Sequence, residues 1–149
     1  MTPRHHAREA ALQILYFWEI GGAEPDQAID AFFAEHQPDA EESARAFAAT
    51  IVHGTIGSIP DLDALIVQHA HNWRLERLAV IDRLILRMAI WELQHEPDTP
   101  PAVVLDEAIE LARTFGTDES VKFVNGVLDG IKKRLEGEGL TQRRKDAEG

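Results

Sequence analysis

The sequence has no cysteine among its 149 residues. This absence excludes a disulfide framework, a cysteine nucleophile and a thiolate metal site, and it is compatible with a reducing cytosol. A long apolar run is also missing, because four charged residues interrupt the 12 apolar side chains of residues 78–93. A membrane-spanning helix needs about 18 apolar residues in succession, and the first residues lack the apolar segment of a secretory signal. We therefore expect a cytoplasmic protein without a membrane segment.

Basic residues are few: 15 lysines and arginines stand against 26 acidic residues, which gives a net charge of −11. The acid is concentrated in residues 21–72, which hold nine acidic residues and one arginine, whereas the two ends of the chain are neutral to basic. This total charge argues against nonspecific binding to nucleic acids or membrane surfaces.

Motifs of common enzymes are absent as well. The sequence contains no GxGxxG or Walker A phosphate loop, no GxSxG nucleophile turn and no HExxH metal motif. His69 and His71 could ligate a metal, but no third ligand is evident, and solvated histidines in a connector are the simpler interpretation. We expect no catalytic residues, no metal and no cofactor.

The apolar spacing is helical throughout, with no run of strand-like alternation. Start signals predict seven helices, beginning near residues 3, 25, 39, 58, 75, 100 and 117. We predict an all-α, seven-helix bundle with a three-helix subdomain (about 1–57), a four-helix subdomain (58–135) and a disordered tail (136–149). The fifth helix is apolar nearly all round and should be central, with four residues in the core: Ile85, Leu86, Ala89 and Leu93.

Charged residues within this fifth helix need partners or solvent. Arg87 and Glu92 are expected to pair with residues of other helices, and Glu107 or Glu110 are candidate partners for Arg87.

Two places are candidates for binding. Arg4 and Arg8 stack one turn apart, and His5 and His6 between them would add charge when protonated; ordinary surface histidines are the alternative. Lys122, Asn125 and Gly126 share one face of the last helix and could receive a phosphate and a base edge. Close helix packing around the glycine is the alternative here.

Several stretches resemble the family of the transcription antitermination factor NusB over about residues 3–135. They are Ala7-Arg8-Glu9 followed by Ala11, Leu12, Gln13, Leu15 and Tyr16; Asp82-Arg83, Leu86-Arg87 and Glu92-Leu93; Asp106 to Ala112; and Lys122 to Asp129. The last two blocks, in this order and spacing, are specific. The resemblance implies an all-helical fold with three-helix and four-helix subdomains.

The resemblance also implies a non-enzymatic, RNA-binding role. Members pair with NusE, a small-subunit ribosomal protein, recognise the boxA element of ribosomal RNA transcripts, and support an antitermination complex on RNA polymerase. Carried over to this sequence, the implied RNA-binding residues are Arg4, Arg8, Lys122, Phe123 and Asn125. The family often begins with consecutive arginines, and this sequence departs from that pattern with His5 and His6, which we add to the candidate RNA-binding residues. Glu76 and Asp82 of the central helix are implied to face NusE.

Two alternatives stay open. One is a helical protein-interaction module, possibly a homodimer, that does not bind RNA. The other is a domain like the NusB-like part of some ribosomal RNA methyltransferases, although the chain is too short to hold the methyltransferase domain and lacks its Gly-rich cofactor loop.

Overall fold

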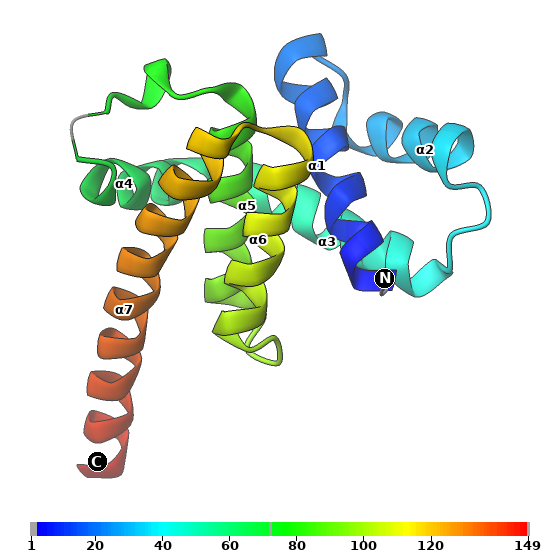
Figure 1. Ribbon diagram of the computed structural model, residues 1–149. Coiled ribbons are helices and arrows are strands. Elements are labelled where there is room, and N and C mark those ends of the chain that lie inside the picture. Colours follow the sequence, from blue (N-terminus) through cyan, green and yellow to red (C-terminus); the bar gives the residue numbers. More distant parts are fainter. Residues whose placement is uncertain (1–2, 72, 149) are drawn as a thin grey trace.

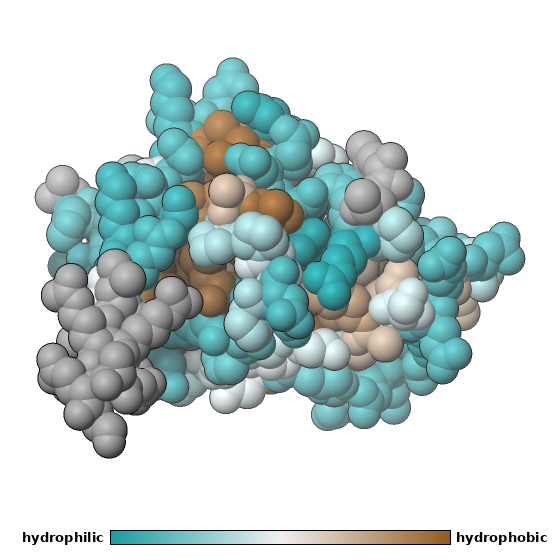
Figure 2. Space-filling model, turned by 90° about the horizontal axis from the view of Figure 1, so that it is seen from below, coloured by the Kyte–Doolittle hydropathy of each residue, from teal (hydrophilic) through white to brown (hydrophobic). Residues whose placement is uncertain are grey.

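The chain folds into seven α-helices and one short 3-10 helix within the residues that the structure describes (Figure 1). This computed structural model describes residues 3–71 and 73–148, with side chains up to residue 138. These ranges contain no strand, so the predicted all-α class and helix number are confirmed. None of these helices is long and apolar enough to cross a membrane. Hydrophilic residues cover most of the face in Figure 2, and hydrophobic ones appear between them as separate patches.

The first three helices pack against one another. They are α1 (Pro3–Gly21), α2 (Pro25–His36) and α3 (Glu42–Gly57). The predicted apolar stripe of α1 is buried, since Ala11, Ile14 and Leu15 are 0% exposed. Gly22 has a φ of 70°, a conformation that glycine adopts without strain, and it turns the chain from α1 into α2. Helix α3 begins at Glu42 rather than near Asp39, where the sequence analysis placed its start.

The remaining helices surround α5 (Figure 1). In chain order they are α4 (Ile59–His69), the 3-10 helix η1 (Leu75–Arg77), α5 (Val80–His95), α6 (Pro101–Phe115) and α7 (Asp118–Glu148). Every residue of α5 from Leu84 to Glu92 is buried, which confirms its central place. Ile85, Leu86 and Ala89 lie in the core as predicted, whereas Leu93 is half-buried and packs against it.

The central helix starts later than predicted. The sequence analysis placed its start at Leu75, but Leu75–Arg77 form η1 and the chain then runs extended through Leu78 and Ala79. The buried Leu78, which is 7% exposed, packs into the core at this point. Its extended backbone separates the two helical segments.

A close helix crossing joins the two halves of the molecule. A Cβ added at Gly54 of α3 would overlap the indole of Trp91 on α5, so only glycine lets these two helices approach so closely. Because α5 contacts α1 and α3 as well as α4, α6 and α7, one core runs through both halves. The division into subdomains near residue 57 stays a prediction.

The last helix is longer than the sequence suggested. The predicted disordered tail began at residue 136, but α7 continues as a helix to Glu148. Ion pairs four residues apart support its described part: Lys133–Asp129 at 2.9 Å, Arg134–Glu138 at 3.2 Å and Lys132–Glu136 at 3.8 Å. Residues 139–149, including the basic Arg143–Lys145 run, lie outside the described side chains.

Candidate nucleic-acid and partner interface

A capping motif fixes the start of α7 and thereby the positions of the candidate RNA-binding residues that follow it. The Thr117 backbone N–H donates to Ser120 Oγ at 3.1 Å, and the Ser120 backbone N–H donates to Thr117 Oγ1 at 3.2 Å. Such reciprocal bonds satisfy amide groups that a helix N-terminus leaves without partners. Lys122, Phe123 and Asn125 then occupy the first two turns of a well-anchored helix.

Lys122, Asn125 and Gly126 form an open face of α7. All three are exposed, and the two side chains make no hydrogen bond or ion pair with any described residue. A Cβ at Gly126 would meet nothing within 4 Å. Close packing, the alternative for this glycine, is therefore not what offsets its cost of about 1 kcal/mol in a helix interior.

An aromatic pair lies next to this face. The ring of Phe123 is 5.9 Å from that of Trp73, centroid to centroid, in an edge-on arrangement. Trp73 belongs to the connector between α4 and α5 and is 56% exposed. Arg74 and Arg77 of the same connector are exposed, and their side chains bond to no described residue.

The sequence did not point to these three connector residues. Trp73 and Arg74 stand out in the sequence, but only the fold brings Trp73 against Phe123 of α7. We call Lys122, Phe123 and Asn125, together with Trp73, the α7 patch; Arg74 and Arg77 follow in the connector.

Arg4 is available at the surface near the N-terminus of α1. It is exposed, its Nη1 donates to Thr99 Oγ1 at 3.3 Å, and its guanidinium lies 4.5 Å from the centroid of the Phe47 ring. A guanidinium has five N–H donors, so most of them remain free for a ligand. The contacts with Thr99 and Phe47 hold the side chain in one place.

Arg8, by contrast, belongs to the interior. It is 4% exposed, and its Nε and Nη2 donate to the two carboxylate oxygens of Glu92 at 2.9 and 2.5 Å. This bidentate geometry joins α1 to α5 and is the strong form of such a pair. Arg8 therefore cannot meet RNA in this structure, and we leave it out of the proposed surface.

The two histidines between these arginines also differ from each other. The His5 side chain is 12% exposed and lies between two carboxylates, 2.9 Å from Glu9 Oε1 and 2.7 Å from Glu107 Oε2. His6 is exposed. Of the run from Arg4 to Arg8, only Arg4 and His6 face outward.

The two candidate RNA-binding groups lie at opposite ends of α6. Arg4 lies beside Thr99, just before α6 begins, and Lys122 follows just after α6 ends. A 15-residue helix is about 22 Å long, so the structure does not bring Arg4 and the α7 patch together. An RNA strand would have to span this distance to touch both.

The buried charges of α5 pair with other helices, as expected, but not with the expected partners. Arg87 makes a bidentate contact with Asp63 of α4 at 2.8 and 2.9 Å and reaches Glu19 of α1 at 3.2 Å. Its predicted partners, Glu107 and Glu110, lie elsewhere: Glu107 contacts His5, and Glu110 contacts Arg113. Packing against α1 and α4, which the sequence did not reveal, decides this pairing.

The two residues predicted to face a partner lie on different elements. Glu76 is exposed in η1 rather than on α5, and Asp82 lies half-buried in the first turn of α5. Asp82 Oδ1 is shielded from solvent, with no hydrogen-bond partner among the described residues. A shielded carboxylate oxygen without a partner is costly. A docked protein cannot reach an atom that water does not reach, so Asp82 can offer a partner only the exposed part of its side chain.

An apolar hollow is lined by Ile81, the residue before Asp82. It has a volume of about 360 Å³, and its lining includes Tyr16 and Phe17 of α1, Ile81 of α5 and Phe115 at the end of α6. Tyr16 and Phe17 are 39% and 50% exposed. Exposed aromatic rings around a hollow are typical of protein interfaces, so this surface extends the candidate partner site beyond the two acids.

The described residues give no support to a metal site. They contain no group of three or more histidine and acidic side chains that could hold a metal ion. His69, one of the two histidines considered above, lies with Nδ1 3.0 Å from the backbone oxygen of Leu65.

The fold and these surfaces define a small, all-helical protein with an open lysine, amide and aromatic face and a separate acidic–apolar face. The chain belongs to the NusB family, whose model matches residues 5–133. The transcription antitermination protein NusB of Sorangium cellulosum is 44% identical over 135 residues, which cover 91% of this chain and 95% of that protein. NusB of Symbiobacterium thermophilum is 43% identical, covering 90% and 92%.

Solved structures agree with this assignment. NusB of T. maritima superposes with a TM-score of 0.81 at 36% identity, covering 89% of this chain and 92% of that one. A crystal structure of the antitermination factors NusB and NusE in complex with double-stranded RNA matches with a TM-score of 0.81 at 28% identity, covering 90% and 98%.

Proposed function

We propose that this protein is an RNA-binding transcription antitermination factor that acts with NusE on boxA RNA of ribosomal RNA transcripts. Family membership supports the role. The open Lys122–Asn125 face carries the RNA-binding part, because neither Lys122 nor Asn125 makes a side-chain hydrogen bond or ion pair with a described residue. The role is one of binding and assembly on RNA polymerase rather than of catalysis. A protein with this role would act on transcripts in the cytoplasm.

In this proposal the α7 patch reads the RNA. Single-stranded RNA is recognised through stacked bases and exposed base edges. Lys122 would neutralise a phosphate, Asn125 would bond to a base edge, and the exposed ring of Trp73, held edge-on by Phe123, offers a stacking face. Arg74 and Arg77 would bind further phosphates from the connector.

Arg4 forms a second, smaller contact at the other end of α6, with His6 beside it. A strand that reaches both places binds more tightly than one that reaches only the α7 patch, because two linked contacts reinforce each other. His5 is held between Glu9 and Glu107 and serves to fix α1 rather than to meet a phosphate.

NusE would bind on the acidic–apolar face. Asp82, half-buried in the first turn of α5, offers negative charge, and the hollow between Tyr16, Ile81 and Phe115 offers apolar area. Glu76 would add negative charge for a basic partner, which chiefly speeds association. RNA and NusE then contact different residues and can bind together, and the two surfaces meet in the connector, where Glu76 lies between Arg74 and Arg77.

The α7 patch is tested by mobility shift with boxA RNA and a scrambled RNA in the presence of NusE. Asn125→Ala should erode the discrimination between the two RNAs, whereas Lys122→Ala should weaken both alike. Lys133→Ala on the same helix, whose side chain is paired with Asp129, is the matched control and should change neither. If wild type binds neither RNA, with or without NusE, the protein is an interaction module and the proposal is wrong.

A further inference from the structure

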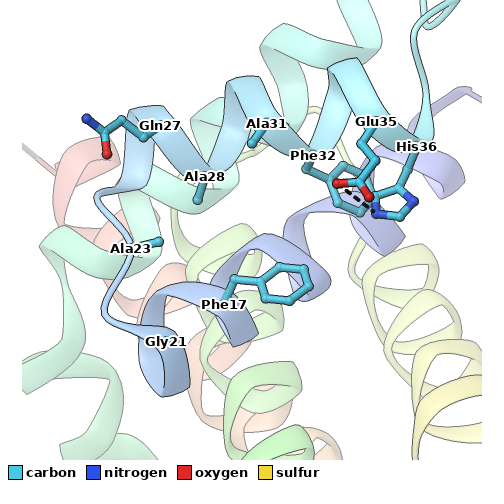
Figure 3. A pocket seen from close by; sticks show the side chains of 9 residues that line it. All are labelled: Phe17, Gly21, Ala23, Gln27, Ala28, Ala31, Phe32, Glu35 and His36. Atoms are coloured by element: carbon cyan, nitrogen blue, oxygen red, sulfur yellow. Dashed lines mark ion pairs between the residues drawn. The ribbon is translucent and has the colours of Figure 1, made fainter.

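A further groove lies between the end of α1 and α2 (Figure 3), and it shares Phe17 with the hollow beside Ile81. It has a volume of about 580 Å³, within the usual range for ligand-binding clefts. Phe17 of α1 and Phe32 of α2 turn toward each other across it, the small Ala28 and Ala31 leave room between them, and Glu35 and His36 close one end.

The apolar part of this groove is uncovered in the protein alone. The Phe17 ring is 50% exposed and Ala31 is exposed, while Phe32 is buried and forms the floor. An aromatic side chain of this kind gains most from burial under a partner. The groove is therefore built to receive apolar side chains.

A second hollow continues the groove beyond the end of α2. It has a volume of about 510 Å³, and His36 lines both spaces. Its lining mixes apolar residues such as Pro3, Pro38 and Ala44 with the polar His6, Asp39 and Glu41. The combined groove is apolar at one end and acidic at the other, and it follows α2, a helix of 12 residues or about 18 Å.

The surrounding charge is of one sign. The sequence contains no lysine or arginine between Arg8 and Arg45, and this stretch holds nine acidic residues. Some of these are paired, such as Asp30 with Arg45. Of the acids that line the groove, Glu35 contacts only His36, at 3.9 Å, and Asp39 and Glu41 pair with no described residue. Such a field repels RNA and attracts a basic protein segment.

We propose that this groove docks a basic, amphipathic helix of a partner protein other than NusE. Helix-in-groove binding uses apolar anchors at i, i+3, i+4 and i+7, and about three turns match the length of α2. The anchors enter between Phe17 and Phe32, and lysine or arginine side chains of the next turn reach Glu35 and Asp39. The site lies on α1 and α2, whereas Asp82 lies on α5, so a third protein could join the RNA and NusE complex.

The test uses two fluorescent synthetic peptides of about four helical turns. Both carry leucines at i, i+3, i+4 and i+7, and the other positions are mostly lysine in one and glutamate in the other. We expect saturable binding of the lysine peptide in a fluorescence anisotropy titration and no binding of the glutamate peptide. Absence of saturable binding, or equal binding of both peptides, overturns the proposal.

Two matched variants of α2 locate the site. Ala31 lines the groove, whereas Ala34, three residues later, is exposed outside it. Ala31→Arg fills the groove with a cation and should weaken binding roughly tenfold, the equivalent of 1.4 kcal/mol. Ala34→Arg makes the same charge change on the same helix and should have little effect. Equal weakening by both variants would mean attraction by net charge alone and contradicts a groove.

Competition with NusE distinguishes the partner. Because Phe17 also lines the hollow beside Ile81, the two surfaces are neighbours. Saturating NusE should leave the lysine peptide bound, and circular dichroism should show an intact fold for each variant. Displacement of the peptide by NusE would mean that the groove belongs to the NusE site, which overturns the separate partner but leaves the proposed function untouched.

Discussion

Removing the Arg8 guanidinium should destabilise the protein far more than removing an exposed arginine. Arg8→Ala leaves the Glu92 carboxylate buried beneath α1, where the side chains of the pair are each 4% exposed. Glu107 cannot compensate, because it is itself acidic and lies 3.9 Å from Arg8 Nη1. Loss of one partner from a buried ion pair costs about 3–5 kcal/mol. We expect this loss in the free energy of unfolding, measured by urea denaturation followed by circular dichroism.

Two further variants separate the pair from its surroundings. Arg4→Ala, one turn earlier and exposed, should cost less than about 1 kcal/mol. The double variant Arg8→Met, Glu92→Leu removes both charges and should recover most of the stability, since apolar replacement of a whole buried pair is often neutral. A loss below about 0.5 kcal/mol for Arg8→Ala would refute the assignment of Arg8 to the interior and return it to the candidate RNA surface.

The other predictions concern the core, the helix crossing and the RNA surface. Leu86→Ala should cost about 2–5 kcal/mol in urea denaturation because Leu86 is 0% exposed; a loss near zero would place α5 at the periphery. Gly54→Ala should lower the melting temperature, since its Cβ would overlap Trp91. Gly126→Ala, in open space, should raise stability by up to about 1 kcal/mol. A stabilising Gly54→Ala together with a destabilising Gly126→Ala would contradict the described packing. Lys122→Ala should reduce the slope of log affinity for RNA against log salt by about 0.7, and an unchanged slope would show that this lysine meets no phosphate.

The fold was largely predictable from the sequence because each helix carries its own signals. Apolar spacing, glycines and prolines predicted the number of helices and most of their boundaries. The apolar residues of 78–93 lie on nearly every face of a helix, and this pattern predicted that the helix is central. The start of α5 was not predictable in this way. The helical spacing of apolar residues continues through Leu78. The backbone at Leu78 is nevertheless extended, and its side chain is buried in the core.

The candidate site was predictable only in part, because exposure depends on packing between distant segments. Arg4 and Arg8 share a helix face by spacing, yet Glu92, 84 residues away, covers only Arg8. Trp73 reaches Phe123 through the connector path, which no local pattern encodes. Helix spacing placed Lys122 and Asn125 on one face, and the resemblance to a known family added Phe123 and the RNA-binding role. The structure added that the lysine and the amide make no hydrogen bond or ion pair with other described residues.

The central claim, joint recognition of RNA with NusE, is tested most directly by one titration. Labelled boxA RNA is titrated with this protein alone, with NusE alone and with an equimolar mixture, and the mixture is repeated with Asp82→Lys. The account predicts the tightest binding for the wild-type mixture and a loss of that gain with Asp82→Lys, which removes the shielded carboxylate while leaving the α7 patch intact. Equal RNA affinity with and without NusE, or a gain that survives Asp82→Lys together with Glu76→Lys, would contradict it.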